Sequence, residues 1–430
     1  MIVSPELEQE TFKSSLLHQL EQLDKGDPLY KVRLKAAERV KEIGFPTKKS
    51  EVYRYIKLRH LYTRNYTLGC AASVEAHWID PLVLPESTHS ILVFVNGHFR
   101  RDLSRLEAIP SKVVISSLEE AAQTYGTLLN NHLNQSLKDE EDAFSAVNTA
   151  LHRHGAFVYI PPRSVLEKPI QILHFVNAGE GLHFLLPRIN IFVGAQAEAS
   201  FAATCYNHGE QEYLSHQLFD FVIEEGAHVQ LGQDLTGMPS SAWHFEAVKA
   251  YLKKNSSFKS TCITTGCATV RTDYKITLAG ENCETSLNGA WILEDKNESH
   301  VNVIVDHQAP HCRSNQLFKG VLHDFSRSSF EGKIMVRQAA QKTEAFQLNN
   351  NLVLSDHAHA NSKPNLEIFA DDVKATHGAT IGQLDSEQLF YMKTRGFSIA
   401  EAQKLLIHGF YEEVIERLPL KSMREKRLFS

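Results

Sequence analysis

Residues 157 to 373 carry roughly two hundred positions of short apolar runs, with almost no segment patterned as a helix. Runs such as 170–175, 218–223 and 285–293 are separated by Gly, Asn, Asp and Ser, as β-strands are. Small turns introduce several runs at intervals of roughly thirty residues, the kind of period expected of a coiled solenoid. So much β-structure without helices excludes a Rossmann or TIM architecture, and leaves a sandwich, a barrel, a propeller or a β-solenoid.

Helix signals flank this region on both sides. Before it, Ser4-Pro5-Glu6 and Asp27-Pro28 are typical helix starts, the second leading to a stripe that ends at Gly44, and Asp142 begins a further helix. After it, Asp385 or Ser386 can cap a helix that closes at Gly396, and Ser398 with Glu401 forms a capping box for another. We therefore expect a helical N-terminal domain with a small β element (1–155), a β core (156–382) and a C-terminal helical domain (383–430).

Composition excludes several classes of protein. The 430 residues have a formal net charge of −6, whereas a nucleic-acid binder normally shows a basic face and a high pI. No apolar run approaches the ~18 residues that would suggest a membrane span, and the first residues lack a signal-peptide pattern. The six cysteines are scattered without a C-x-x-C pair. The chain is thus expected in a reducing, cytoplasmic setting, free of membrane and nucleic acid.

One stretch near the end is far more specific than the rest. Residues Lys363 to Thr380 read KPNLEIFADDVKATHGAT, and are followed by Gln388-Leu-Phe-Tyr391 and Arg395-Gly396. This text resembles the C-terminal signature of the SufB/SufD family of iron–sulfur cluster assembly proteins. Weaker likeness runs from Gly44 to Pro161, where Tyr53 replaces the usual Trp. The family's usual cysteine within the signature is Ala375 here.

The resemblance implies a fold and a set of partners. It implies a right-handed parallel β-helix between the two helical domains. It implies a scaffold subunit, of the SufD branch because of His377-Gly-Ala-Thr, that pairs with a SufB-type chain and binds the ABC-type ATPase SufC. No cofactor would be bound stably by this chain alone; iron or a nascent Fe–S cluster would be held transiently in the complex. A homodimer is possible where SufB is absent.

His377 is the candidate metal ligand. A neutral imidazole can hold iron, and histidine replaces thiolate on some clusters. From the residues alone, a hydrogen-bonded turn histidine is the simpler interpretation. The resemblance implies a ligand at the SufB–SufD contact, and Ala375 removes the thiol that would lie beside it.

The C-terminal helices are the candidate partner surface. They carry more apolar side chains than two short helices can bury between themselves, so they pack onto the β body, meet a partner, or do both with different faces. The family resemblance implies docking of SufC here. The candidate residues are Phe390, Tyr391, Arg395, Gly396, Leu405, Leu406 and Phe410.

Other polar clusters favour structural roles. Adjacent Asp371 and Asp372 point to opposite faces of a strand, so they suit a turn better than a glycosidase pair. His307, His311 and Cys312 match no standard metal spacing. The chain has no phosphate loop, G-x-S-x-G or H-E-x-x-H motif, so we expect no enzymatic activity of its own. A purely structural partner of SufB and, in another class, a carbohydrate-active β-helix enzyme remain the alternatives.

Overall fold

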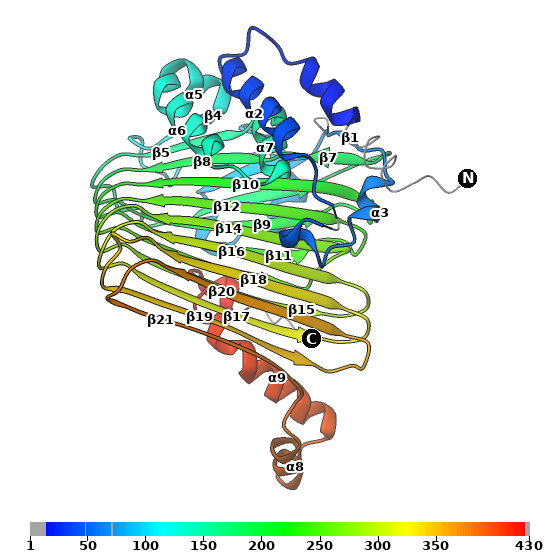
Figure 1. The fold of residues 1–430 in the computed structure, drawn as a ribbon. Coiled ribbons are helices and arrows are strands. Elements are labelled where there is room, and N and C mark those ends of the chain that lie inside the picture. Colours follow the sequence, from blue (N-terminus) through cyan, green and yellow to red (C-terminus); the bar gives the residue numbers. More distant parts are fainter. Residues whose placement is uncertain (1–13, 48, 70–71, 426–430) are drawn as a thin grey trace.

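The fold is a stack of parallel strands with helices at both ends, seen in a computed structural model that describes residues 14–47, 49–69 and 72–425 (Figure 1). Successive strands alternate between two facing sheets, so the chain winds as a flattened coil. Strand order in each sheet skips every other strand: β21-β19-β17-β15-β13-β11-β9 in one, and β20-β18-β16-β14-β12-β10-β8 in the other. Facing sheets also occur in sandwiches, but these strands pair in parallel with the strand two places along, which defines a β-solenoid.

The strand bounds follow from this winding. The first sheet contains β4 (Val114–Ser117), β5 (Ala156–Ile160), β8 (Arg188–Val193), β10 (Tyr213–Ile223), β12 (Trp243–Leu252), β14 (Thr269–Leu278), β16 (Glu298–His307), β18 (Arg327–Val336) and β20 (His359–Ile368), with β7 (His183–Leu185) beside β10 and β1 (Thr67–Leu68) beside β7. The second contains β3 (His98–Phe99), β2 (Ile91–Val95), β6 (Ile170–Val176), β9 (Glu198–Asn207), β11 (His228–Gly237), β13 (Ser257–Thr264), β15 (Glu284–Leu293), β17 (Arg313–Leu322), β19 (Thr343–Val353) and β21 (Val373–Gly382).

The pairing register confirms the period predicted from the turns. Between β8 and β21, a residue lies beside the one 26 to 32 positions later: Trp243 beside Thr269 is the shortest step, and Arg327 beside His359 the longest. The expected β-helix core between helical flanks is therefore confirmed. One coil consists of two strands of roughly ten residues and the turns that follow them, which together account for the spacing of about thirty residues.

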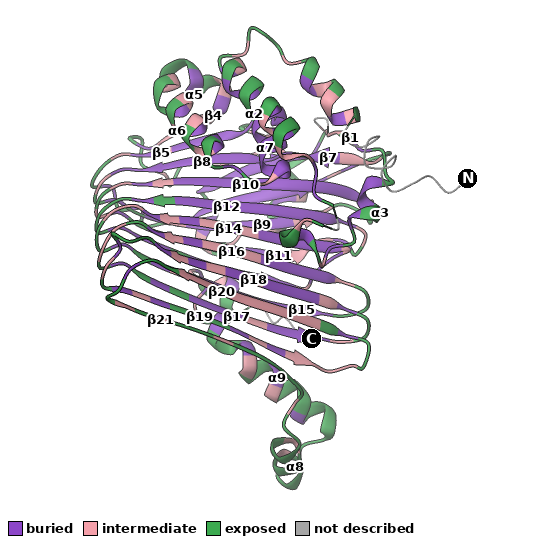
Figure 2. Ribbon diagram, in the orientation of Figure 1, coloured by how far each residue is buried: buried purple, intermediate pink, exposed green. Residues whose placement is uncertain are grey.

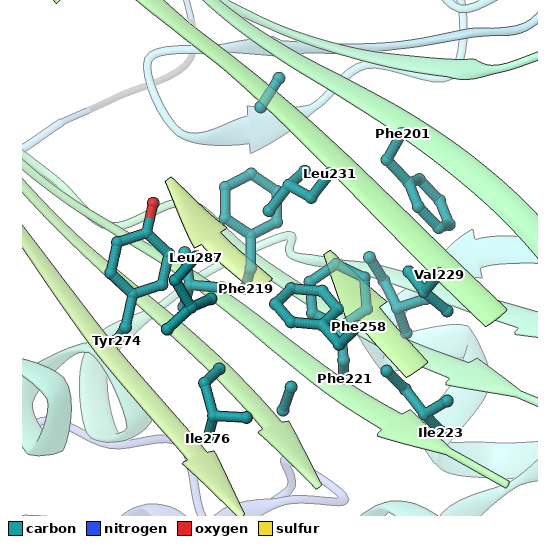
Figure 3. Close-up of a cluster of buried hydrophobic side chains, with 14 of the residues drawn as sticks. Phe201, Phe219, Phe221, Ile223, Val229, Leu231, Phe258, Tyr274, Ile276 and Leu287 are labelled. Atoms are coloured by element: carbon teal, nitrogen blue, oxygen red, sulfur yellow. The ribbon is translucent and has the colours of Figure 1, made fainter. Parts of the chain in front are cut away.

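Apolar side chains from the two sheets meet inside the coil. Phe201 of β9, Phe219 and Phe221 of β10, and Phe258 of β13 point toward one another across the gap between the sheets (Figure 3). These rings are buried, as is most of the solenoid apart from its last coil (Figure 2). Burying each such ring removes a large apolar area from water, so stacking of coils is the main source of stability.

Helices cover the first coils and extend beyond the last ones. The N-terminal group contains residues 14–21, α2 (Tyr30–Ile43), η1 (Glu51–Tyr53), α3 (Leu58–Tyr62), α4 (Ala76–Ile79), η2 (Asp80–Leu82), η3 (Pro85–Ser87), α5 (Leu118–Thr124), α6 (Gly126–Lys138) and α7 (Ala143–Leu151). The C-terminal group contains α8 (Ser386–Thr394), α9 (Ile399–Ile415) and α10 (Lys421–Arg424). None of the described helices is long and apolar enough to cross a membrane.

The predicted helix ends are largely confirmed. Asp142 caps α7 by accepting a hydrogen bond from the Ser145 amide, and Asp385 caps α8. Ser398 and Glu401 make both bonds of the predicted capping box on α9. The start predicted at Ser4-Pro5-Glu6 lies outside the described residues.

Candidate functional site

The last coil of the solenoid leaves two strand edges open. β20 and β21 end the strand order of their sheets, and no other described strand pairs with their outer edges. An unpaired edge presents a row of backbone N–H and C=O groups that can template pairing with another chain. Pro364 lies within β20, beside Gly332. An edge strand tolerates proline because one side of its backbone needs no ladder bond.

Apolar side chains surround these open edges. Ile368 and Phe369 at the end of β20 are 39% and 61% exposed, and Ile381 in β21 is 53% exposed. Elsewhere along the solenoid most large apolar residues are buried (Figure 2). Exposed apolar groups next to unpaired backbone are typical of a protein–protein interface.

His377 lies in the middle of β21, not in a turn. Its neighbour in register is Gln347 of β19, a residue that is 3% exposed and points into the coil. Neighbouring residues of paired strands point to the same face of a sheet, so His377 also points to the interior side. No described coil covers β21, and His377 is therefore exposed at the mouth of the solenoid.

A short polar row leads to His377 from within the coil. The Gln347 side chain donates from Nε2 to Oε1 of Gln316 on β17 at 2.8 Å. Among the described residues, Oε1 of Gln347 has no hydrogen-bond partner. An exposed imidazole above this row can donate a nitrogen lone pair to a metal.

Ala375 lies two residues before His377 on the same face of β21. It lies beside Ala345 of β19, and it packs with Val373 against a small apolar cluster. Residues two apart on a strand are separated by about 6.5 Å and share a face. A thiol at position 375 would therefore lie on the same side of the strand as His377, but this chain has a methyl group there.

The other polar clusters take structural places. Asp371 and Asp372 lie in the turn between β20 and β21, where the Asp372 amide donates to Oε1 of Gln341 at 2.9 Å. His307 is buried with Nε2 2.9 Å from the Ser314 hydroxyl, whereas the Cys312 thiol donates to the Gly280 carbonyl. In the described part of the chain, no group of three or more His, Cys, Asp or Glu residues is placed to hold a metal ion.

The C-terminal half of α9 docks on the outside of the second sheet. Ile407, Tyr411, Val414 and Ile415 pack against apolar residues of β13, β15 and β17. Partly buried Phe410 lies under Lys319, with the ammonium 5.3 Å from the ring centroid. This half of the helix fixes the module to the solenoid.

The remainder of the module projects away from the solenoid (Figure 1). Phe390 is 68% exposed, Tyr391 56% and Leu405 49%, while Leu406 is half-buried. The guanidinium of Arg395 lies 5.1 Å from the centre of the Tyr391 ring, and Nη2 donates to the Tyr391 hydroxyl at 2.9 Å. Gly396, with φ of 95°, allows the left-handed turn that ends α8.

Sequence reasoning missed part of this surface. Phe397 and Ile399, at the turn between α8 and α9, are also exposed, as are the apolar residues at the β20 and β21 edges. A Phe and an Ile next to a helix cap usually pack against each other or the helix, so the sequence does not mark these two as exposed. Their exposure follows from the way the module projects from the solenoid.

The fold and this site together define an assembly component. The described chain is a β-solenoid with two open strand edges at one end and a projecting helical module that carries exposed apolar side chains. The family model described as the SufBD core domain of the SUF system for FeS cluster assembly matches residues 174–410, and the SufBD N-terminal region matches 14–172. The chain belongs to the SufBD family of iron–sulfur cluster assembly proteins.

Individual relatives agree with this membership. An iron–sulfur cluster assembly SufBD family protein of Synechocystis is 30% identical over 90% of this chain and 87% of its own length. The iron–sulfur cluster assembly protein SufD of Escherichia coli is 27% identical over 90% of this chain and 88% of its own. The chloroplastic protein ABCI7 of Arabidopsis thaliana is 25% identical, covering 93% of this chain and 84% of its own length.

Proposed function

We propose that this chain is a SufD-type scaffold subunit that pairs with a SufB-type chain through the open end of its solenoid. The main support for this proposal is that β20 and β21 each have an unpaired outer edge, with exposed Ile368, Phe369 and Ile381 next to these edges. Edge pairing with a second solenoid would satisfy the free backbone groups and bury these side chains together. Where no SufB-type chain is present, a second copy of this chain is the alternative occupant, giving a homodimer.

His377 would then face the partner and serve as a ligand for iron or a nascent cluster, which is the cargo of the complex. Its position at the mouth of the coil supports this role, since an imidazole there is open to a neighbouring chain. Its neighbours on β21 and β19 are alanines and an amide, so the remaining ligands would come from SufB. The cargo would be held only transiently.

The projecting helices would bind the SufC-type ATPase. Phe390, Tyr391 and Leu405 supply an exposed apolar surface on an arm that is fixed to the solenoid through α9. ATP-driven movement of SufC would pull on this arm and strain the contact at the solenoid end. The chain itself would be a non-enzymatic subunit in the cytoplasm, working away from membranes and nucleic acids.

A purely structural partner of SufB is the closest rival, and Ala375 favours it because the usual thiol is absent. Membership of an iron–sulfur cluster assembly family argues against the carbohydrate-active alternative. Co-purification from native extract tests the pairing: a SufB-like chain and an ABC ATPase should accompany the tagged protein. Recovery of the tagged protein alone would contradict the proposal.

A further inference from the structure

An N-terminal segment crosses the outer face of the first sheet and is anchored there. We call residues 49–62 the strap. The Tyr53 hydroxyl donates to Asp142 at 2.6 Å, and the guanidinium of Arg271 on β14 lies 3.8 Å from the centre of the Tyr53 ring. Glu51 forms an ion pair with Lys363 of β20. The strap thus connects the helical end of the protein to its last coil.

A hollow of about 680 Å³ lies between the strap and the starts of β16, β18 and β20. Its walls carry four permanent cations and two histidines: Arg54, Lys57, Arg59, Arg327, His60 and His300. Among its described lining residues there is no Asp or Glu. The whole chain has a net charge of −6, so this concentration of positive charge runs against the composition of the protein.

Two arginines of this hollow, one from the strap and one from the sheet, form no ion pair among the described residues. In the described residues neither Arg54, from the strap, nor Arg327, from β18, forms an ion pair, whereas Lys57 lies 3.4 Å from Glu298. The adjacent hollow of about 760 Å³ differs, because Glu212, Asp295 and Asp324 line it. Of these two neighbouring hollows, only the one under the strap has cationic lining residues without a carboxylate among its described lining residues.

Apolar and aromatic groups complete the same walls. Tyr55 is half-buried at the hollow. The buried residues Ile56 and Leu58 also line it, next to the cationic side chains. Guanidinium groups bind phosphate through paired N–H donors, while a tyrosine ring offers a face for stacking. The volume is within the range of ~300–1,000 Å³ typical of small-molecule sites.

We propose that this hollow binds a nucleotide, with phosphates on Arg54 and Arg327 and the planar base against Tyr55. The hollow uses none of the residues assigned above to the solenoid-end interface or to the helical arm, so it adds to the proposed scaffold function. A nucleotide here would touch the strap and the last coils at once. Binding would therefore tighten the contact between the N-terminal segment and the coils nearest the docking edge.

Calorimetric titration of the full chain tests the site with three probes: ADP, adenosine and pyrophosphate. ADP should bind at least about tenfold more tightly than either fragment, because only ADP uses both the cations and the ring. Arg54→Gln and Arg327→Gln should each weaken ADP binding about tenfold, and raising the salt concentration should weaken it further.

Arg64→Gln is the matched control, since Arg64 follows the strap, lies outside this hollow and pairs with Glu212 at 3.3 Å. It should leave ADP binding unchanged. Thermal unfolding of each variant reports whether the fold is intact, and Arg54 is exposed, so its substitution leaves the core untouched. Equal affinity for ADP and pyrophosphate, no ADP binding at millimolar concentration, or wild-type binding by both arginine variants would overturn the proposal.

Discussion

His377 lies directly beside Gln347, thirty positions earlier in the chain, because β21 pairs in register with β19. Paired neighbours share a face of the sheet, so the imidazole points to the same interior side as buried Gln347, and no further described coil covers it. A position that would be interior in any earlier coil is therefore accessible at this one. The same relationship lets the side chain be changed without disturbing the core.

The first prediction concerns His377 itself. His377→Ala should lower the yield of cluster on the reconstituted complex by about tenfold or more, since an alanine offers no lone pair to iron. The free energy of unfolding should change by less than about 0.5 kcal/mol, as for other exposed positions. Cluster absorbance and urea denaturation measure the two effects.

His359→Ala provides a control for this test, because His359 is also exposed on the last coil, at the start of β20. It should keep the wild-type cluster yield. Unchanged yield in His377→Ala would retire the ligand role and leave the chain as a structural partner. Ala375→Cys tests the missing thiol: a higher yield would show that sulfur next to His377 contributes.

The second prediction concerns the helical arm. Phe390→Ala combined with Leu405→Ala should weaken binding of the ATPase by about thirtyfold, because exposed aromatic and aliphatic anchors dominate such interfaces. Surface plasmon resonance with the purified ATPase measures the change. Phe325→Ala is the control, since Phe325 is 54% exposed but lies on the solenoid, stacked on His357. Equal losses in both variants would contradict a specific site on the arm.

The third prediction concerns the anchor of the strap. Burial raises the pKa of Tyr53 well above its usual value, so its hydroxyl stays protonated and donates to Asp142. Tyr53→Phe should destabilise the protein by about 1–3 kcal/mol because it leaves the half-buried Asp142 carboxylate without this donor. Tyr53→Ala should cost about 3–5 kcal/mol by adding a cavity between Phe144 and Phe245.

Urea denaturation measures both Tyr53 variants. Val52→Ala is the neighbouring control, because Val52 is 42% exposed and contributes its carbonyl, which any residue retains, to Arg271. Its stability should be close to that of the wild type. A Tyr53→Phe variant as stable as the wild type would show that the hydroxyl bond to Asp142 adds nothing to the anchor.

The fourth prediction concerns acid stability. Burial lowers the pKa of His174 to about 3 and that of His216 to about 4, so both rings stay neutral in the folded chain. Unfolded histidines take up protons below about pH 6.5, and the free energy of unfolding should therefore fall as the pH drops from 6.5 toward 4. At neutral pH both states are neutral, and these rings add no pH dependence.

His174→Gln isolates one of these contributions, since glutamine does not titrate. The loss of stability between pH 7 and pH 4.5 should be smaller in this variant than in the wild type by roughly 2–3 kcal/mol. Because His174 stacks on Phe94 at 4.8 Å, the variant will be less stable at every pH, so only the pH dependence is compared. Identical pH dependence of the two proteins would contradict the prediction.

Much of the fold could be predicted because the relevant signals are local. The Ser398–Glu401 capping box and the Asp142 cap involve residues three positions apart, and both formed as expected. Alternation within strands and turns at thirty-residue spacing likewise depend on near neighbours. The position of His377 within a strand could not be predicted in this way, because a glycine after the histidine is compatible with a turn as well as with a strand. The pairing of β21 with β19 settles that position.

The sequence by itself determined the coil period, the helical flanks and the family, because hydrophobic alternation, caps and a long signature motif are written in consecutive residues. Only the tertiary structure decided which positions are exposed. Ile381 and His377 have the pattern of interior residues, yet they lie at the mouth of the coil, since exposure there depends on whether another coil follows. The hollow under the strap combines Arg54 and Arg327, which are far apart in the chain, and no local pattern brings such residues together.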